Sequence, residues 1–359
     1  MIFLNKPVAP DLVKLNRYLE KVNKSCWYTN FGPMHQALTE RLEDYLGVKN
    51  LLLVSNGTLA IQVAAKALNV SKSITTPFSF VATSSSLLWQ GIDVAFSDID
   101  PSSLNISTDK LEQVWEEHPS YDSLLATHVY GNPCDVKKID ELAKKYNKKV
   151  IYDAAHAFGI NVGGDSVLSF GEASTLSFHA TKVFHTIEGG AIVFKNKVDF
   201  DKAKKLINFG IQNDGTLGEP GINAKLNEYQ AAVGLCLLDN IDEILEHRST
   251  LFELYRKELK DIIDMPLWHD NANYNGAYMP ICPENETVRL KIGHNLSAND
   301  IQFRRYFYPS LDKAYPKIKN FGCEISNAIA ENALCLPLHF YMSENDILKV
   351  CKAIKGAQL

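Results

Sequence analysis

The distribution of apolar and polar residues along the chain predicts short elements that alternate between helix and strand. Residues Met34–Leu46 carry apolar side chains at helical spacing, and Gly47 ends that pattern. The apolar run Leu51–Val54 comes next, and the turn Ser55–Thr58 separates it from a second helical stretch, Leu59–Leu68. We therefore expect a helix, a buried strand, a tight turn and a second helix in this part of the chain.

The same alternation continues through the first half of the chain. Short apolar strands separated by helical crossovers are typical of a parallel or mostly parallel sheet that is buried on both faces. The expected class is therefore a doubly wound α/β fold with helices on both faces of the sheet. The further predicted strands are 73–76, 94–97, 124–128 and 150–153, and the further predicted helices are 79–89 and 136–146.

A change of pattern predicts a second domain. Two helical stretches, Leu226–Leu238 and Asp239–Leu259, lead out of the first region. Short strands and helices follow them, which predicts a smaller C-terminal α+β domain. We place the boundary near residue 240, with residues 1–240 as the large domain, including an N-terminal arm, and residues 241–359 as the small domain.

Composition excludes several classes of partner. The chain has 359 residues, of which 46% are hydrophobic and 22% charged, as in ordinary globular proteins. Its formal net charge of −5 provides no general attraction to nucleic acid or to an anionic membrane, so neither is expected as a partner. An anionic substrate would have to bind local cations.

The cysteines and the first residues predict a cytoplasmic protein without a bound metal. The seven cysteines are scattered and include no C-x-x-C pair, which favours reduced thiols over a disulfide framework or a zinc site. The opening MIFLNKPVAP has no basic segment followed by an apolar one. No apolar run approaches the roughly eighteen residues of a membrane span.

The turn Ser55–Thr58 is a candidate phosphate site. It lies between a predicted strand and a predicted helix, so its backbone N–H groups and the Thr58 hydroxyl can bind an anion at the positive end of the helix. A simple helix cap with a glycine turn explains the same residues. The chain contains neither G-x-G-x-x-G nor G-x-x-x-x-G-K-[ST], which argues against a dinucleotide site or an NTP-hydrolysing site.

Three further residues give this turn a chemical context. Asp153 ends the predicted strand VIYD, and STLSFHATK places Ser177 on a strand and Lys182 in the loop beyond it. Taken singly, the aspartate could cap a helix and the lysine could be a solvated charge. Together they match pyridoxal phosphate (PLP), which needs a lysine amine for a Schiff base, an acidic partner for its pyridine nitrogen and donors for its phosphate.

The order of motifs resembles one known family. SNGTLAI, PFSFVATS, FSDID, YDAAHAFG, SFHATK, EGG and GINAKLNEYQAAVG occur in that order, and RRYFYPSLDKAY follows in the C-terminal region. This order resembles the DegT/DnrJ/EryC1/StrS family of sugar-nucleotide aminotransferases, a branch of the fold-type I, aspartate-aminotransferase-like PLP enzymes. The resemblance implies a PLP-dependent transferase that is a homodimer with shared active sites.

The resemblance also implies a role for each matching residue. Lys182 would be the catalytic Schiff-base lysine and general base, Asp153 would pair with the pyridine nitrogen, and His156 would lie over or beside the ring. The remaining cofactor contacts implied by the motifs are Gly57, Thr58 and Ser177 on the phosphate, Phe80 stacked on the ring face, and Asn223 reaching the phosphate from the second subunit.

Two of the candidate substrate-binding positions differ from the residues that the family usually has. Lys225 stands where the family commonly has Arg, and His185 occurs in HTIEGG where T-T-G-E-G-G is frequent. Both are candidate substrate-binding residues, although a histidine at position 185 is also expected in a surface loop. In FRRYFYPSL, Arg304, Arg305 and Tyr308 could bind a diphosphate and cover a sugar or base, or could simply be surface residues.

The expected reaction is the transfer of an amino group from L-glutamate to a nucleotide-linked ketosugar. RRYFYP and WYTNFGP resemble members that act at C4 of dTDP-4-keto-6-deoxyglucose, which implies a place in deoxyamino sugar biosynthesis, such as that of lipopolysaccharide O-antigens. The alternatives are a 3-ketosugar aminotransferase, a sugar 3-dehydratase and a non-catalytic PLP-fold sensor. Lys182 argues against the dehydratase, because those enzymes have His at that position.

Overall fold

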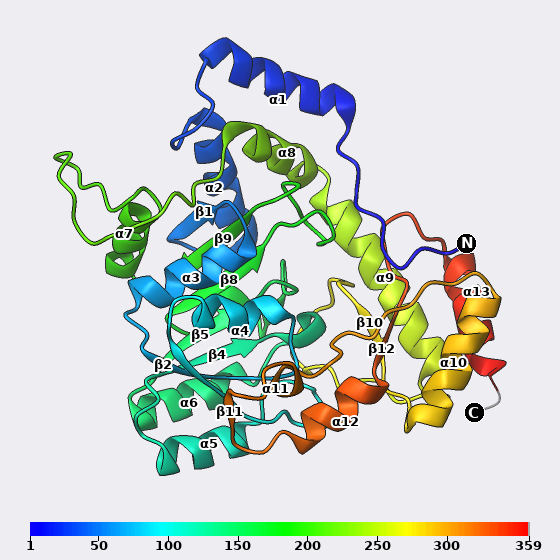
Figure 1. The fold of residues 1–359 in the computed structure, drawn as a ribbon. Helices are drawn as coiled ribbons and strands as arrows, with labels where there is room; N and C mark the ends of the chain where they lie inside the picture. Colours follow the sequence, from blue (N-terminus) through cyan, green and yellow to red (C-terminus); the bar gives the residue numbers. More distant parts are fainter. Residues whose placement is uncertain (358–359) are drawn as a thin grey trace.

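An eight-stranded mixed sheet forms the centre of the protein, within residues 1–357 that the computed structural model describes (Figure 1). Its strand order is β1-β9-β8-β5-β4-β2-β3-β11, and β9 alone runs antiparallel to both neighbours. The strands are β1 (Leu51–Val54), β2 (Lys72–Thr75), β3 (Asp93–Phe96), β4 (Ser123–Thr127), β5 (Lys149–Asp153), β8 (Ala173–Ser177), β9 (Gly190–Phe194) and β11 (Lys319–Asn320).

Helices cover both faces of this sheet because its strands are apolar on both sides. In β1, Leu51 and Leu53 belong to one hydrophobic core, whereas Leu52 and Val54 belong to the other. The first core includes α2 (Pro33–Leu46), α5 (Thr108–Glu117), α6 (Val136–Tyr146) and α8 (Glu228–Leu238). The second includes α3 (Gly57–Ala67), α4 (Val81–Leu88) and α7 (Lys197–Leu206).

A further core holds the C-terminal region together. It joins α9, α10 and α13 to a two-stranded antiparallel sheet of β10 and β12. Two shorter helices, α11 and α12, pack nearer the large sheet (Figure 1). The elements are α9 (Ile241–Leu259), β10 (Met279–Ile281), α10 (Glu286–Ala298), α11 (Leu311–Ala314), α12 (Glu324–Asn332), β12 (Leu334–Leu336) and α13 (Glu344–Lys355).

The chain crosses between these regions more than once. Ile2 forms a bridge with Ile301, so the N-terminus lies on the C-terminal region, where Figure 1 shows it beside α13. The short strand β11 returns to the large sheet and pairs with β3. The helix α9 begins at Ile241, and the domain boundary near residue 240 stays a prediction.

The smaller elements complete the fold. α1 (Leu12–Ser25) packs on α8, and Asp11 caps it by accepting hydrogen bonds from the backbone N–H groups of Val13 and Lys14. A hairpin and two 3-10 turns make up the rest: β6 (Asn161–Val162), β7 (Asp165–Ser166), η1 (Val129–Gly131) and η2 (Val167–Ser169). Within residues 1–357, no helix combines the length and apolar character that a membrane crossing needs.

The structure confirms the predicted α/β class with a mostly parallel sheet. Element ends differ from the predictions by one or two residues; the helix predicted over 79–89, for example, spans Val81–Leu88. Within residues 1–240, three helices, α1, α5 and α7, were not predicted, and the helices after residue 259 were predicted only as a group. For α1 a signal exists, because Asp11 precedes apolar residues at helical spacing.

Candidate active site

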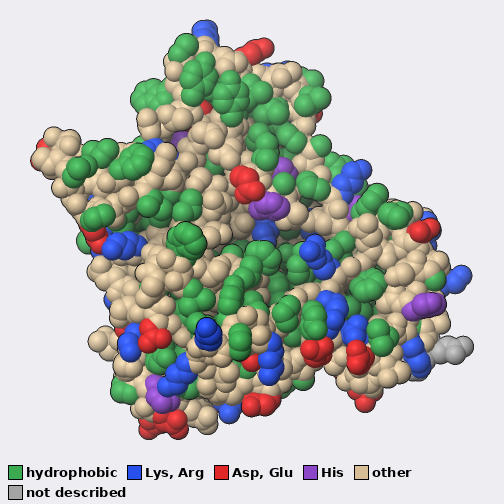
Figure 2. Space-filling model, in the orientation of Figure 1, with side chains coloured by type: hydrophobic (Ala, Val, Ile, Leu, Met, Phe, Trp, Pro, Cys, Tyr) green, Lys and Arg blue, Asp and Glu red, His purple; other side chains and the backbone are tan. Residues whose placement is uncertain are grey.

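A cavity of about 410 Å³ lies where the carboxyl ends of parallel strands meet the start of α3. Segments far apart in the sequence line it, including the loop after β2, the ends of β5 and β8, and the C-terminal region. Figure 2 shows a hollow near the middle of the face drawn there, with charged and histidine side chains beside apolar ones. The predicted residues that line the cavity are Gly57, Thr58, Phe80, Asp153, His156, Ser177, Lys182 and Arg304.

The start of α3 packs tightly against the sheet. Asn56 caps the helix, its Oδ1 accepting a hydrogen bond from the Leu59 N–H at 2.9 Å. A Cβ on Gly57 would lie 2.8 Å from the Ser177 Cβ, and one on Gly190 would lie 2.7 Å from the Leu176 carbonyl oxygen. Only glycine permits this approach, so the first turn of the helix and its free N–H groups are held at the cavity wall.

Asp153 is a buried carboxylate at the end of β5. Its Oδ2 accepts a hydrogen bond from the Thr83 hydroxyl at 2.7 Å, and its Oδ1 accepts one from the Ala155 N–H at 3.1 Å. Burial raises the pKa of Asp153, whereas these two hydrogen bonds and the charge of Lys182 act in the opposite direction. The carboxyl group is thus oriented by two donors and keeps lone pairs free toward the cavity.

Lys182 lies in the turn after β8, where its backbone N–H donates to the His179 carbonyl. Burial lowers the pKa of its amine to about 8 from an ordinary value of 10.5, although the charge of Asp153 opposes this shift. The amine nitrogen lies 5.9 Å from the centre of the Tyr278 ring. Near neutral pH, a far larger fraction of this amine is neutral than for an exposed lysine, so it can act as a nucleophile and as a base.

His156 is held between aromatic rings. Its ring lies 4.7 Å from that of Tyr278 and 6.0 Å from that of Phe307, centre to centre, and is nearly parallel to the latter. Burial, followed by the charge of Lys182, holds the pKa of His156 well below its usual range, so the imidazole is neutral. Its Nδ1 is buried without a hydrogen-bond partner, which leaves a polar atom available to a ligand.

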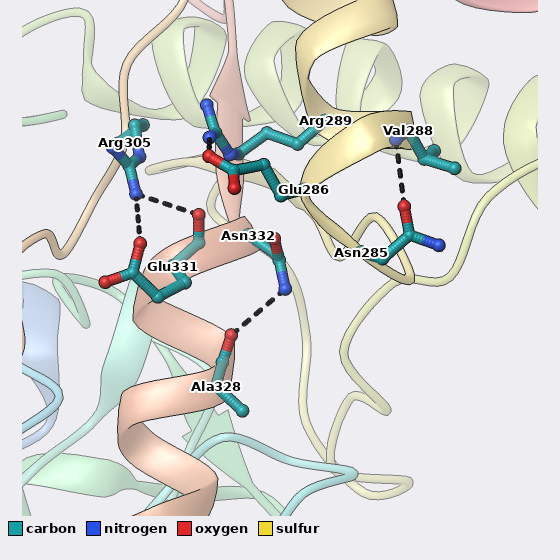
Figure 3. A network of polar contacts seen from close by, with 8 residues as sticks. All are labelled: Asn285, Glu286, Val288, Arg289, Arg305, Ala328, Glu331 and Asn332. Atoms are coloured by element: carbon teal, nitrogen blue, oxygen red, sulfur yellow. Dashed lines mark hydrogen bonds and ion pairs between the residues drawn. The ribbon is translucent and has the colours of Figure 1, made fainter.

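Two adjacent arginines have different surroundings. Arg304 lines the cavity, and its guanidinium lies 5.1 Å from the Tyr306 ring centre. Arg305 turns toward α12, where it donates to the Glu331 carbonyl oxygen at 2.8 Å and to its carboxylate at 3.0 Å (Figure 3). The Arg305 guanidinium also lies over the Tyr308 ring, with its carbon Cζ 3.4 Å from the ring centre. Arg305 and Tyr308 therefore contact each other and do not line the cavity.

Three other predicted residues, His185, Asn223 and Lys225, do not line the cavity. His185 is only 3% exposed, its Nε2 lies 2.9 Å from the Val8 carbonyl oxygen, and its Nδ1 accepts from the Ile187 N–H. The expectation of a surface-loop histidine is therefore wrong, because residue 8 of the N-terminal arm covers this ring. Asn223 is exposed, and its backbone forms an isolated β-bridge with Asn208. Lys225 Nζ donates a hydrogen bond to Asn208 Oδ1 at 2.6 Å.

Several lining residues were missed by the sequence interpretation. Tyr278 and Phe307 come from the C-terminal region, and no local pattern connects them with the lining residues before residue 240. Glu188 and His179 lie 3.7 Å apart at the cavity, and both occur in motifs quoted above, EGG and SFHATK. Motif membership was therefore the available signal for this pair. Within the described residues, no cluster of three or more His, Cys, Asp or Glu side chains could hold a metal ion.

The fold and the cavity define a class of enzyme. A lysine, a buried aspartate and a helix N-terminus meet at the carboxyl edge of a doubly wound sheet, as in fold-type I PLP-dependent transferases. Comparison with known proteins identifies the branch, since the profile of the DegT/DnrJ/EryC1/StrS aminotransferase family matches residues 13–355. The chain belongs to this PLP-dependent family and is an aminotransferase, which confirms the predicted resemblance and fold class.

Individual relatives cover nearly the whole chain. It is 42% identical to a dTDP-4-amino-4,6-dideoxy-D-glucose transaminase of Shigella dysenteriae, over 97% of this chain and 96% of the relative. A protein of the same name from Escherichia coli is 37% identical over 98% of each chain. The crystal structure of DesI in the presence of its TDP-sugar product aligns with a TM-score of 0.92 at 27% identity, covering 99% of this chain and 94% of that one.

The cavity fits the family's cofactor. The close approach that Gly57 allows leaves the α3 turn free to bind a phosphate against Ser177. His156 Nδ1 has no hydrogen-bond partner, and the pKa of Lys182 is lowered. Both features are typical of a ligand-binding site. The individual roles predicted for these residues stay predictions.

Proposed function

We propose that this enzyme transfers the amino group of L-glutamate to C4 of dTDP-4-keto-6-deoxyglucose, forming dTDP-4-amino-4,6-dideoxyglucose. One observation carries the reaction type: Lys182, Asp153 and the α3 turn, from three separate segments, meet at one cavity. The names of the two relatives at 42% and 37% identity support this choice of sugar and nucleotide. The reaction belongs to deoxyamino sugar biosynthesis, and O-antigen assembly is the use that we propose for its product.

Different cavity residues would bind different parts of PLP. Lys182 would bind its aldehyde carbon, Asp153 its pyridine nitrogen, and Gly57, Thr58 and Ser177 its phosphate. Phe80 would cover one ring face, and the neutral His156 would lie beside the ring. When bound, PLP supplies the carbonyl that accepts the amino group and a ring that withdraws electrons.

Lys182 is the proton carrier of this chain in the proposed reaction. The free amine of Lys182 lies in the cavity, and burial lowers its pKa to about 8. A base with a pKa near the working pH can both accept a proton from one carbon and return it to another. Asp153 would pair with the pyridine nitrogen, where a carboxylate would stabilise a proton on that atom.

Arg304 is the residue of this chain that we assign to the diphosphate of the sugar nucleotide. It lines the cavity and has no acidic partner among its contacts above, whereas Arg305 is engaged by Glu331. With a net charge of −5, the chain must recruit such an anion through a local cation. The pair His179 and Glu188 at the cavity offers hydrogen bonds for sugar hydroxyl groups or the amino donor.

We further propose a cytoplasmic homodimer with shared active sites. The segment that carries Asn223 exposes several large apolar side chains, as expected of a surface that a second copy covers. They are Phe209, Ile211, Leu217 and Ile222. Asn223 would then reach the phosphate site of the partner, and Lys225, two residues further along, would lie at the same interface. His185 is buried beneath the N-terminal arm of its own chain and is not part of this proposal. Seven cysteines without disulfides suit a reducing compartment.

The experiment is product analysis with a matched lysine control. The purified protein is incubated with PLP, L-glutamate and dTDP-4-keto-6-deoxyglucose, and NMR is expected to detect nitrogen on C4 with stoichiometric 2-oxoglutarate. Lys182→Ala should lose turnover and the visible absorbance that borohydride bleaches. Lys195→Ala, which alters an exposed lysine after β9, should retain both.

Two outcomes would contradict the proposal at different levels. Efficient amination of the 3-keto isomer, with the 4-keto sugar ignored, would replace the substrate and leave the cofactor chemistry intact. Full transaminase activity in Lys182→Ala would remove the assignment of the lysine itself.

A further inference from the structure

Three buried hydroxyl groups form a chain that ends on Asp153. The Thr127 hydroxyl lies 3.0 Å from that of Ser79, which lies 2.7 Å from that of Thr83, which in turn lies 2.7 Å from Asp153 Oδ2. None of the three residues is more than 2% exposed. They come from three elements: the end of β4, the loop after β2, and α4.

The carboxylate at one end determines the direction of every hydrogen bond in this chain. An ionised carboxylate only accepts, so Thr83 must donate its single hydroxyl proton to Asp153. Thr83 can then only accept from Ser79, and Ser79 can only accept from Thr127. All three hydroxyl dipoles therefore point toward Asp153, an arrangement in which each bond polarises and strengthens the next.

A proton on the Oδ2 atom of Asp153 does not fit the same arrangement. If Oδ2 donated to Thr83, the Thr83 hydroxyl could no longer donate to it, and the hydrogen bond that ends the chain would be lost. The sheet also holds the two ends in place, since Thr127 and Asp153 are direct partners in the parallel pairing of β4 and β5. The geometry thus favours an Oδ2 atom that only accepts, with the carboxyl group held in one orientation.

We propose that Thr83, Ser79 and Thr127 are positioning residues that keep Asp153 ionised and aimed at the pyridine nitrogen of the cofactor. This inference rests on the proposed function, because it concerns the site at which PLP would bind. The need for such support follows from burial, which raises the pKa of Asp153, while the hydrogen bond from Thr83 is the largest of the influences that lower it. Lys182 is the charged group that acts on Asp153 from the cavity side, and the neighbouring His156 is neutral.

Isosteric substitution tests the chain of hydroxyls. Thr83→Val removes the donor and keeps the shape, so we expect the dissociation constant of PLP for the apoprotein to rise about tenfold. The kcat should fall by about tenfold or more, with little change in the KM for the ketosugar. Thr83→Ser should restore both values to within about twofold, because it returns the hydroxyl. Ser79→Ala and Thr127→Val should have progressively smaller effects with distance from Asp153.

Ser86→Ala is the matched control. Ser86 lies on the same helix as Thr83, is equally buried, does not itself line the cavity, and donates to the Ala82 carbonyl oxygen rather than to Asp153. Loss of this hydroxyl should lower the apoprotein melting temperature about as much as Thr83→Val does, but should leave PLP affinity and kcat within about twofold. Spectroscopic titration of each apoprotein with PLP measures affinity independently of turnover.

The possible outcomes separate this inference from the proposed function. If the wild-type protein is active and Thr83→Val behaves like Ser86→Ala, the positioning role is wrong and the proposed function stands. If Thr83→Ser is as impaired as Thr83→Val, the hydroxyl is not the operative group, and the inference is again overturned. If the wild-type apoprotein does not bind PLP, both proposals fail together.

Discussion

At the scale of single residues, identical side chains acquire different roles from their surroundings. Arg304 and Arg305 are adjacent in the sequence, yet only Arg304 lines the cavity. Arg305 is held by two contacts to Glu331 and by the Tyr308 ring (Figure 3). A surface ion pair of this kind contributes about 0–1 kcal/mol to the free energy of unfolding, so the ion pair of Arg305 with Glu331 stabilises the fold only slightly. Arg304 is the arginine that we propose for ligand binding.

This difference predicts unequal effects of two otherwise equivalent substitutions. Arg304→Ala should raise the KM for the nucleotide ketosugar about tenfold or more, since it removes charge-assisted hydrogen bonds to the diphosphate. Its kcat should change little, because the diphosphate is bound equally in the ground state and the transition state. Steady-state kinetics at saturating L-glutamate measures both values. Arg305→Ala serves as the control, and a larger KM effect from Arg305→Ala than from Arg304→Ala would refute the assignment.

At the scale of elements, the N-terminus of α3 combines a structural cap with a binding surface. Asn56 satisfies the Leu59 N–H and also lines the cavity. The same cap occurs away from the candidate active site, where Asn285 accepts a hydrogen bond from the Val288 N–H at 3.1 Å at the start of α10 (Figure 3). The two helices therefore separate the contribution of a cap to stability from its contribution to binding.

Replacing each cap by alanine should cost a similar amount of stability but affect binding differently. Asn56→Ala and Asn285→Ala should each lower the free energy of unfolding by about 1 kcal/mol, as loss of an Asn cap does. Only Asn56→Ala should weaken PLP binding, by roughly threefold or more, because the first turn of α3 then loosens at the phosphate site. Denaturant unfolding and PLP titration measure the two effects. Equal affinity in both variants would show that the α3 turn does not bind the phosphate.

At the scale of the whole molecule, the site is assembled from distant parts of the chain. Tyr278 and Phe307 of the C-terminal region line the same cavity as Gly57 and Asp153. The backbone of the Asn223 segment reaches the β1–α3 turn, since the Ser55 N–H donates to the Ala224 carbonyl at 2.9 Å. The Asn223 side chain is nevertheless exposed, so it is available to a second subunit.

A mixed dimer tests whether the active sites are shared. In a dimer of one Lys182→Ala chain and one Asn223→Ala chain, one site combines an intact lysine with an intact partner asparagine, and the other carries both defects. We therefore expect the mixed dimer to recover up to about half of wild-type activity, whereas each homodimer stays weak. Two affinity tags allow its purification. If Asn223 served its own subunit, neither site would be intact, and mixing would restore nothing.

Much of the chemistry could be predicted because the residues that carry it occupy short local patterns. The structure brings four predicted residues to one cavity: Asp153 and Ser177 end strands, Gly57 begins a helix and Lys182 follows a strand. Their own neighbours in the sequence specify each of these elements. The parallel sheet was predictable for the same reason, since strands such as 51–54 are apolar at every position. Carboxyl ends of parallel strands then meet at one edge.

The sequence by itself therefore determined the fold class, the family and the set of reactive residue types. The tertiary structure decided which neighbours those residues have: it buried His185 beneath the N-terminal arm, turned Arg305 toward Glu331 and supplied Tyr278 and Phe307 from the C-terminal region. It also linked Thr83 to Ser79 and Thr127 behind Asp153. Periodicity and motifs record only neighbours along the chain, whereas burial, pKa and hydrogen-bond direction depend on groups that packing brings together from distant segments.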